Sequence, residues 1–174
     1  MVNSQDLEHL RIAVSLAREA LEAGDAPFGS VLVSSTNKVL QTDRNRDVTG
    51  SNNDNRPDAT LHPEFTLAHW AQLNLTAEER AKTTVYTSGE HCAMCSAAHA
   101  WCGLGRIVYV SSTEQYNRWK GEFGVDGGPV NPLSINEVAP GIEAEGPVDG
   151  LYAEVRALHV ERWTAQGFKA KARA

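Results

Sequence analysis

The stretch "TTVYTSGEHCAMCSAAHAWC" (Thr83–Cys102) joins a strand pattern to a helix pattern and contains all three cysteines of the chain. Its β-branched start predicts a strand, and the alanine-rich run from Cys92 to Trp101, which Gly103 follows, predicts a helix. Cys92 and Cys95 are three residues apart, so we expect both thiols on one side of the first helical turn. The stretch therefore predicts a strand–helix unit that presents two thiols where the helix begins.

Strand and helix patterns alternate on both sides of this unit. The predicted elements are a helix over 7–21, a hairpin from "FGSVLVSS" and "VLQT", a helix from Pro63 to about Asn74, a strand at "RIVYVSS", a helix over 113–120, a short strand at "GIEAEG" and a last helix capped by Asp149. This alternation predicts an α/β sandwich built on one sheet. We expect one domain over residues 1–174, with flexible ends at 1–5 and 168–174.

The bulk composition excludes several classes of protein. The chain carries 16 basic and 22 acidic residues, a net charge of −6, and its basic residues cluster only in the tail "FKAKARA". Proteins that bind nucleic-acid phosphates usually show a basic patch, so we expect no nucleic-acid partner. No apolar run is long enough for a membrane helix, and the N-terminus lacks an apolar signal core. Three local cysteines do not make a disulfide framework, which indicates the reducing cytoplasm.

The Cys92-x-x-Cys95 spacing has more than one interpretation. The electropositive start of a helix favours thiolates, the form of cysteine that binds metal. A thioredoxin-like redox pair also places Cys-x-x-Cys at a helix start after a strand. A structural zinc site needs four protein ligands, and the chain has no second Cys-x-x-Cys.

The stretch "TLHPEF" (Thr60–Phe65) favours a catalytic metal site over these alternatives. With two thiolates, His62 completes a set of three ligands that leaves one tetrahedral position for water. Two residues turn a regular helix by about 200°, so Glu64 and His62 converge on one water only if His62 lies at the helix boundary. Pro63 favours that boundary because proline suits the first helical position. Glu64 is then the acid placed to take and return the proton of that water, and a redox pair would leave the His62 and Glu64 pattern unexplained.

These residues resemble the zinc-dependent cytidine deaminase superfamily, whose signature is H-x-E followed by P-C-x-x-C. The chain reads "HPE" at 62–64 and "HCAMC" at 91–95. Within the superfamily it is most similar to the branch of guanine, tRNA adenosine and cytosine deaminases. That similarity covers roughly residues 7–112 and is carried by "GDAPFGSVLV", "DRNR", "DATLHPE" and "VYTSGEHCAMCSAAHAW".

The resemblance implies a fold and a set of roles. The fold is a three-layer α/β/α sandwich with a central mixed five-stranded sheet, and the branch commonly forms homodimers. One zinc ion per chain is held by His62, Cys92 and Cys95. Glu64 shuttles protons in catalysis. In the substrate pocket, Asn45 hydrogen-bonds the base and Phe28 shapes or stacks against it.

Two positions depart from the family pattern. His91 replaces the usual proline before the first cysteine, and Pro63 replaces an alanine or valine. Neither change removes a ligand. His91 lies beside the metal ligands in sequence, so we consider it for substrate binding, together with Phe123 in the loop that follows the helix predicted over 113–120.

The resulting prediction is a zinc-dependent hydrolytic deaminase of a free nucleobase or related amino heterocycle. Guanine-like bases come first, with cytosine, isoguanine and aminotriazines open because all share a ring C–NH2 beside a ring nitrogen. The alternatives are a tRNA adenosine deaminase or a nucleoside or nucleotide deaminase, for which Arg44, Arg46 and Arg56 could hold a phosphate. From another class, a non-catalytic zinc-binding domain stays open. The sequence leaves undecided whether the C-terminal helix or the 121–132 loop closes the pocket of its own subunit.

Overall fold

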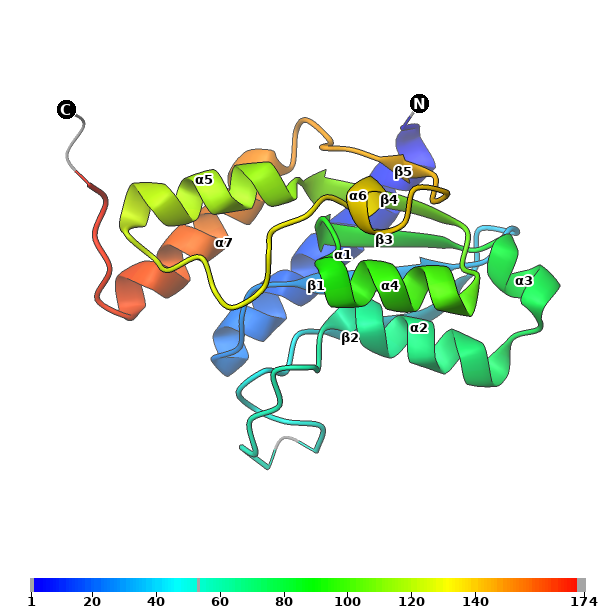
Figure 1. Cartoon of the computed structure of the whole chain (residues 1–174), viewed down its shortest axis with the longest axis horizontal. Coiled ribbons are helices and arrows are strands. Elements are labelled where there is room, and N and C mark those ends of the chain that lie inside the picture. Colours follow the sequence, from blue (N-terminus) through cyan, green and yellow to red (C-terminus); the bar gives the residue numbers. More distant parts are fainter. Residues whose placement is uncertain (1, 53, 172–174) are drawn as a thin grey trace.

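A mixed five-stranded sheet forms the centre of the protein in a computed structural model that describes residues 2–52 and 54–171 (Figure 1). The strands are β1 (Gly29–Val33), β2 (Val39–Arg44), β3 (Thr84–Gly89), β4 (Arg106–Ser111) and β5 (Ala144–Glu145), in the order β2-β1-β3-β4-β5. The pairs β1–β2 and β1–β3 are antiparallel, whereas β3–β4 and β4–β5 are parallel. The parallel pair β3–β4 is joined through a helix, as parallel neighbours require.

Helices cover both faces of this sheet. They are α1 (Ser4–Ala23), α2 (Pro63–Asn74), α3 (Ala77–Ala81), α4 (Ala93–Cys102), α5 (Thr113–Phe123), α6 (Ile135–Val138) and α7 (Tyr152–Ala165). Figure 1 shows α2 and α4 side by side on one face, with α1 and α7 on the other. The observed architecture is therefore the predicted three-layer sandwich on a mixed five-stranded sheet.

Strand β1 shows how the sheet separates two cores. Val31 and Val33 join a cluster with Leu10, Val14 and Val155 of α1 and α7. Leu32, between the two valines, joins a second cluster with residues of α2, β3 and the α4–β4 connection, namely Leu67, Ala68, Ala71, Val85 and Leu104. Because successive side chains of a strand point to opposite faces, the apolar run Val31–Val33 of β1 can pack against helices on both sides.

Most helix boundaries coincide with capping signals that can be read in the sequence. Gly24 ends α1 at φ 95°, the left-handed conformation that its lack of a Cβ permits. The last helix differs from the prediction, because its N-cap is Leu151 and not Asp149. Two short helices were not predicted, although each begins with a readable capping box, Thr76 with Glu79 for α3 and Ser134 with Glu137 for α6.

The two ends of the chain were predicted to be flexible. Ser4 and Gln5 belong to α1, which Asn3 caps by accepting hydrogen bonds from two backbone N–H groups. Near the other end, Phe168 packs against the α1–α7 core and the Lys171 N–H donates to the Glu122 carbonyl at 2.7 Å. Met1 and residues 172–174 lie outside the described residues. Within the described part of the chain, every helix is too short or too polar to cross a membrane.

Candidate metal centre and active-site cavity

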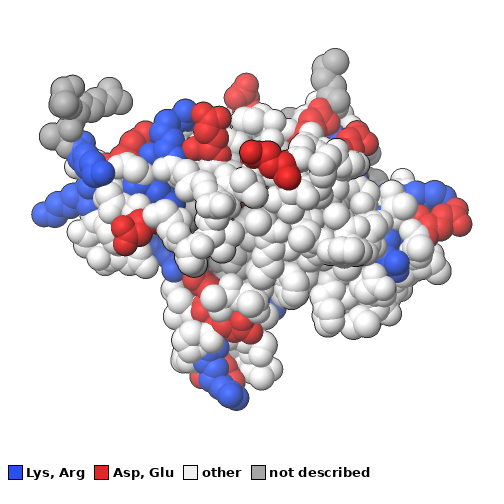
Figure 2. Space-filling model, viewed as in Figure 1, with Lys and Arg blue, Asp and Glu red and all other residues white. Residues whose placement is uncertain are grey.

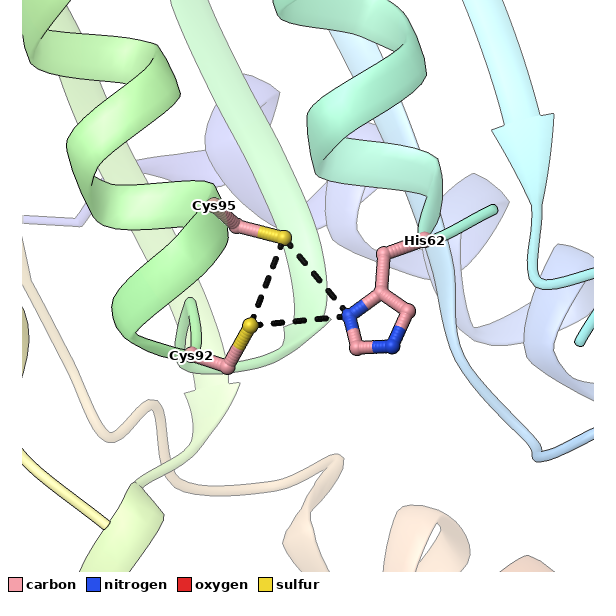
Figure 3. A group of neighbouring side chains, drawn as sticks. All are labelled: His62, Cys92 and Cys95. Carbon is pink, nitrogen blue, oxygen red and sulfur yellow. Dashed lines mark hydrogen bonds between the residues drawn. The ribbon is translucent and has the colours of Figure 1, made fainter. Parts of the chain in front are cut away.

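Three side chains from separate parts of the chain converge at one end of the sheet (Figure 3). His62 is the N-cap of α2, and Cys92 is the N-cap of α4. Cys95 lies in the first turn of α4 and is fully buried. Pro63 occupies the first turn of α2 and so places His62 at the helix boundary, as the sequence predicted.

The distances between the three donor atoms fit a tetrahedral zinc ion. His62 Nδ1 lies 3.5 Å from Cys92 Sγ and 3.6 Å from Cys95 Sγ, and the two sulfurs are 3.6 Å apart. Donors at zinc–sulfur and zinc–nitrogen bond lengths of about 2.3 and 2.0 Å, at tetrahedral angles, are separated by roughly 3.5–3.8 Å. Two thiolates and one imidazole also match the preference of zinc for soft and borderline ligands. This set supplies three of four tetrahedral positions.

The pKa values of the two thiols shift in opposite directions because their sulfur atoms are in contact. Contact with Cys95, and then with the His62 ring, lowers the pKa of Cys92 to about 4. Contact with Cys92, followed by burial, raises the pKa of Cys95. The positive start of α4 further favours negative charge at Cys92. A divalent cation between the donors would stabilise both thiolates at once.

Glu64 lies in the first turn of α2, beside these donors, and is only 6% exposed. Its Oε1 accepts hydrogen bonds from Ser30 Oγ at 3.0 Å and Thr87 Oγ1 at 2.9 Å, two residues paired across β1 and β3. Its Oε2 lies 3.6 Å from Cys95 Sγ. Burial raises the pKa of Glu64. One carboxylate oxygen is thus anchored to the sheet while the other faces the candidate metal centre.

A cavity of about 290 Å³ opens in front of these residues. Its wall includes His62, Glu64 and Cys92 from the candidate centre, and also Phe28 and Asn45, as the sequence predicted for a substrate pocket. The sequence did not single out the other polar residues of the wall, which include Asp47, Glu90, Tyr116, Asn117 and Asn131. Their spacing in sequence carries no periodic signal, because they come from three different loops and one helix.

The long polar segment between β2 and α2 is ordered at the cavity by a buried aspartate. Asp25 accepts hydrogen bonds from the N–H groups of Val48 and Thr49, from Thr49 Oγ1 and from Arg44. Burial raises the pKa of Asp25, but these bonds outweigh it and lower the pKa overall. They fix the stretch that carries Asn45, whose Oδ1 accepts the N–H of Asp47 at 3.0 Å.

The carboxylate of Glu90, in the cavity wall, connects the elements on the α5 side of the cavity. Its two carboxylate oxygens accept the N–H of Thr113 at 2.8 Å and the N–H of Ile135 at 2.9 Å. These bonds tie the starts of α5 and α6 to the turn before Cys92. The connecting segment 127–133 lines the cavity, so this loop closes the site of its own chain.

An aromatic cluster packs behind the part of the cavity wall that contains Phe28 and Tyr116. Phe28 meets Tyr116 edge-on at 5.5 Å, and both rings contact His159 of α7 at 4.9 Å. His159 is 1% exposed, and its Nε2 has no hydrogen-bond partner among the described residues. Helix α7 therefore supports the cavity of its own chain from behind.

The buried state of His159 predicts a pH-dependent loss of stability. Burial lowers its pKa to about 3, whereas the unfolded chain titrates near 6.5. Below pH 6.5 the unfolded state binds the extra proton, so His159 lowers the free energy of unfolding by about 1.4 kcal/mol per pH unit. We expect the free energy of unfolding, measured in urea, to change less between pH 6.5 and 5 in His159→Phe than in the wild-type protein. His69→Phe, at an exposed site of α2, is the control, and an unchanged slope in His159→Phe would contradict the assignment.

Two residues considered for substrate binding lie elsewhere. His91 is fully buried, its ring faces His99 at 5.4 Å, and it is not part of the cavity wall. The turn from β3 into α4 directs Cys92 to the cavity and His91 away from it. Phe123 packs against Trp163 of α7 at 5.7 Å and is likewise absent from the wall. The structure therefore does not support substrate contacts for His91 or Phe123.

Comparison with known proteins identifies the family. The sequence model described as "Cytidine and deoxycytidylate deaminase zinc-binding region" matches residues 3–111, well over half of the chain. The chain belongs to this family. It is 33% identical over 113 residues to a probable cytosine deaminase of Schizosaccharomyces pombe, covering 65% of this chain and 64% of that protein. It is also 35% identical over 103 residues to the guanine deaminase of Bacillus subtilis, covering 59% of this chain and 62% of that protein. The matches thus span less than two thirds of either relative.

Solved structures of this zinc-binding deaminase family share the fold. The guanine deaminase of Nitrosomonas europaea superposes with a TM-score of 0.67 at 20% identity and covers 94% of this chain and 86% of that one. A structure in complex with 2,6-diaminopurine gives a TM-score of 0.69 at 21% identity and covers 100% and 89%. These identities are low, so the superpositions establish the architecture and leave the substrate open.

Proposed function

We propose that this family member is a zinc-dependent hydrolytic deaminase of a free nucleobase or related amino heterocycle. One observation carries the proposal. The second oxygen of the Glu64 carboxylate, Oε2, lies 3.6 Å from Cys95 Sγ, beside a three-donor set, in the wall of a cavity of about 290 Å³. A purely structural zinc site has no use for that carboxylate.

Each residue has a defined role in the proposed reaction. His62, Cys92 and Cys95 hold the zinc ion, which when bound supplies a Lewis acid that activates water. Glu64 accepts one proton from the attacking water and passes it to the ring nitrogen, and it then passes the proton of the resulting hydroxyl to the departing amino group. The C–NH2 bond breaks, a C=O bond forms, and one water is consumed for each ammonia released. Anchoring of Oε1 by Ser30 and Thr87 keeps Oε2 in position during both transfers.

The cavity wall favours an uncharged planar substrate. No lysine or arginine is among the described residues that line it, whereas three carboxylates are, those of Asp47, Glu64 and Glu90. The rings of Phe28 and Tyr116 offer surfaces against which a flat heterocycle can pack. Asn45 Oδ1 is engaged by the Asp47 N–H, so the Asn45 amide is oriented to donate through Nδ2 to a ring carbonyl or nitrogen. Guanine-like bases come first, with cytosine, isoguanine and aminotriazines as further candidates.

The alternative substrates receive less support. Arg44 pairs with Asp25 at 2.6 Å and Arg46 with Asp43 at 2.7 Å, so both are engaged in the fold and neither lines the cavity. Arg56 is exposed and also lies outside the wall. Figure 2 shows Lys and Arg side chains dispersed next to acidic ones on the face in view, in keeping with the net charge of −6. Both features disfavour a nucleotide or a tRNA substrate.

A screen for ammonia release tests the proposal. The zinc-loaded protein is incubated with guanine, cytosine, adenine, isoguanine, aminotriazines and the matching nucleosides, and ammonia is measured by a coupled assay. We expect release from at least one free base and slower release from its nucleoside. The absence of ammonia from every compound, with zinc bound, would favour the non-catalytic zinc domain. A homodimer and a cytoplasmic location are proposals that follow from the family resemblance and the cysteine content.

A further inference from the structure

Like Glu90, Asp47 is an acidic side chain of the cavity wall that the proposed reaction does not use. It follows β2, two residues after Asn45, and its backbone is held on both sides. Its N–H donates to Asn45 Oδ1 at 3.0 Å, and its carbonyl accepts the N–H of Asp58 at 3.1 Å. The carboxylate is therefore presented to the cavity by a fixed backbone, in the same wall as Phe28 and Glu64.

The hydrogen-bonding capacity of this carboxylate is only partly filled. Oδ1 accepts the N–H of Ala26 at 2.9 Å, and Oδ2 lies 3.5 Å from Arg162 of α7. The ion pairs of Arg44 and Arg46 are 2.6 and 2.7 Å long, so Arg162 holds Oδ2 far more loosely. A carboxylate can accept about four hydrogen bonds. Its side chain is 26% exposed, so a ligand in the cavity can reach the unused lone pairs.

Asn45 and Asp47 present complementary groups on one short turn. The Asn45 amide offers an N–H donor, because its oxygen is used within the turn, and it is 2% exposed. Asp47 offers an acceptor. A neighbouring donor and acceptor match the O=C–N–H edge of an amino heterocycle that also carries a ring carbonyl, as cytosine and guanine do and adenine does not. A bound base would displace water from this carboxylate, and leaving it then without a donor costs free energy, so a ligand lacking the N–H is penalised.

We propose that Asp47 is a specificity-determining residue that, together with Asn45, reads the O=C–N–H edge of the base. This inference rests on the proposed deaminase function and narrows its substrate class to bases with a carbonyl beside a ring N–H. It also gives a reason for discrimination against analogues substituted at that nitrogen, because they lose the hydrogen bond and bring bulk against the carboxylate.

The test compares bases with analogues methylated at that N–H. Values of kcat/KM are measured on the wild-type protein for cytosine against 1-methylcytosine and for guanine against 1-methylguanine. We expect at least about 100-fold lower kcat/KM for the methylated member of the pair, because sites built to bind a substrate N–H reject analogues lacking it strongly. In Asp47→Asn, the amide oxygen can still accept the N–H of Ala26, whereas an NH2 group, which is a donor, replaces Oδ2. We expect the discrimination to fall about tenfold or more, with Asp54→Asn in the same polar loop as the control.

Each outcome separates this inference from the function beneath it. If the wild-type protein turns over a base and its methylated analogue equally well, the role of Asp47 is overturned and the deaminase function is unaffected. This comparison needs no variant. An equal loss for both members in Asp47→Asn, with zinc retained, indicates a structural role and also overturns it. Ammonia released only from compounds without a carbonyl beside a ring N–H, such as adenine, overturns the proposed edge. Absence of ammonia from all compounds overturns the proposed function itself.

Discussion

Glu64→Gln is expected to lower kcat for ammonia release by about 10³-fold or more while leaving zinc bound. General acid–base catalysis by a positioned side chain contributes roughly 10²–10⁴-fold, and Glu64 would act in more than one proton transfer. Glutamine keeps the shape of the side chain, and its carbonyl oxygen can still accept from Ser30 and Thr87. The glutamine amide cannot accept the proton of the water and return it to the substrate. Steady-state assays with the best base from the screen, and zinc analysis of the same sample, measure both quantities.

Controls for this substitution use the rest of the chain. Glu78→Gln changes an exposed carboxylate of α3 that is not part of the cavity wall, and it should leave kcat unchanged. Thermal unfolding shows whether Glu64→Gln is folded, and we expect it to be at least as stable as wild type because a buried charge is removed. Undiminished turnover in Glu64→Gln would remove this residue from the mechanism.

Cys92→Ser is expected to abolish zinc binding and, with it, ammonia release. A set of one thiolate and one imidazole lacks the charge and donor count that hold zinc tightly. Zinc also links the starts of α2 and α4, so its loss should lower the free energy of unfolding. Structural zinc in small folded units contributes on the order of 10 kcal/mol, so we expect a loss of several kcal/mol here. Zinc stoichiometry and urea unfolding, each with and without a chelator, measure the two effects.

Cys102→Ser is the matched control, since Cys102 is the last residue of α4 and packs against the α2 side of the core. It should retain about one zinc per chain and full activity. If Cys92→Ser keeps zinc and turnover while Cys102→Ser loses them, the ligand assignment fails. A protein that reduces disulfides without zinc would instead support the redox interpretation.

The sequence predicted the metal centre well because its signals are local. The Cys92-x-x-Cys95 spacing fixes two donors in one helical turn, and Pro63 fixes the start of the helix after His62. The need for a third ligand, and then the family resemblance, linked His62 to the cysteines, a contact that depends on how α2 and α4 pack and that no periodicity encodes. The alternation of strands and helices was likewise sufficient for the sandwich.

Residues outside these motifs were less predictable. His91 is next to Cys92 in sequence, yet the tight turn before α4 sends the two side chains to opposite sides. Asp47 and Tyr116 reach the cavity only through tertiary contacts of a long loop and of α5, so neither was identified. Helix α7 begins after Leu151 without a side-chain cap, and so the cap predicted at Asp149 was wrong.

X-ray absorption at the zinc edge tests the metal centre most directly. For protein containing about one zinc per chain, we expect two sulfur ligands near 2.3 Å and two nitrogen or oxygen ligands near 2.0 Å, one of them exchangeable solvent. Loss of the zinc signal in Cys92→Ser would complete the assignment. A shell closed by a further protein donor, or full turnover by metal-free protein, would contradict a catalytic zinc at His62, Cys92 and Cys95.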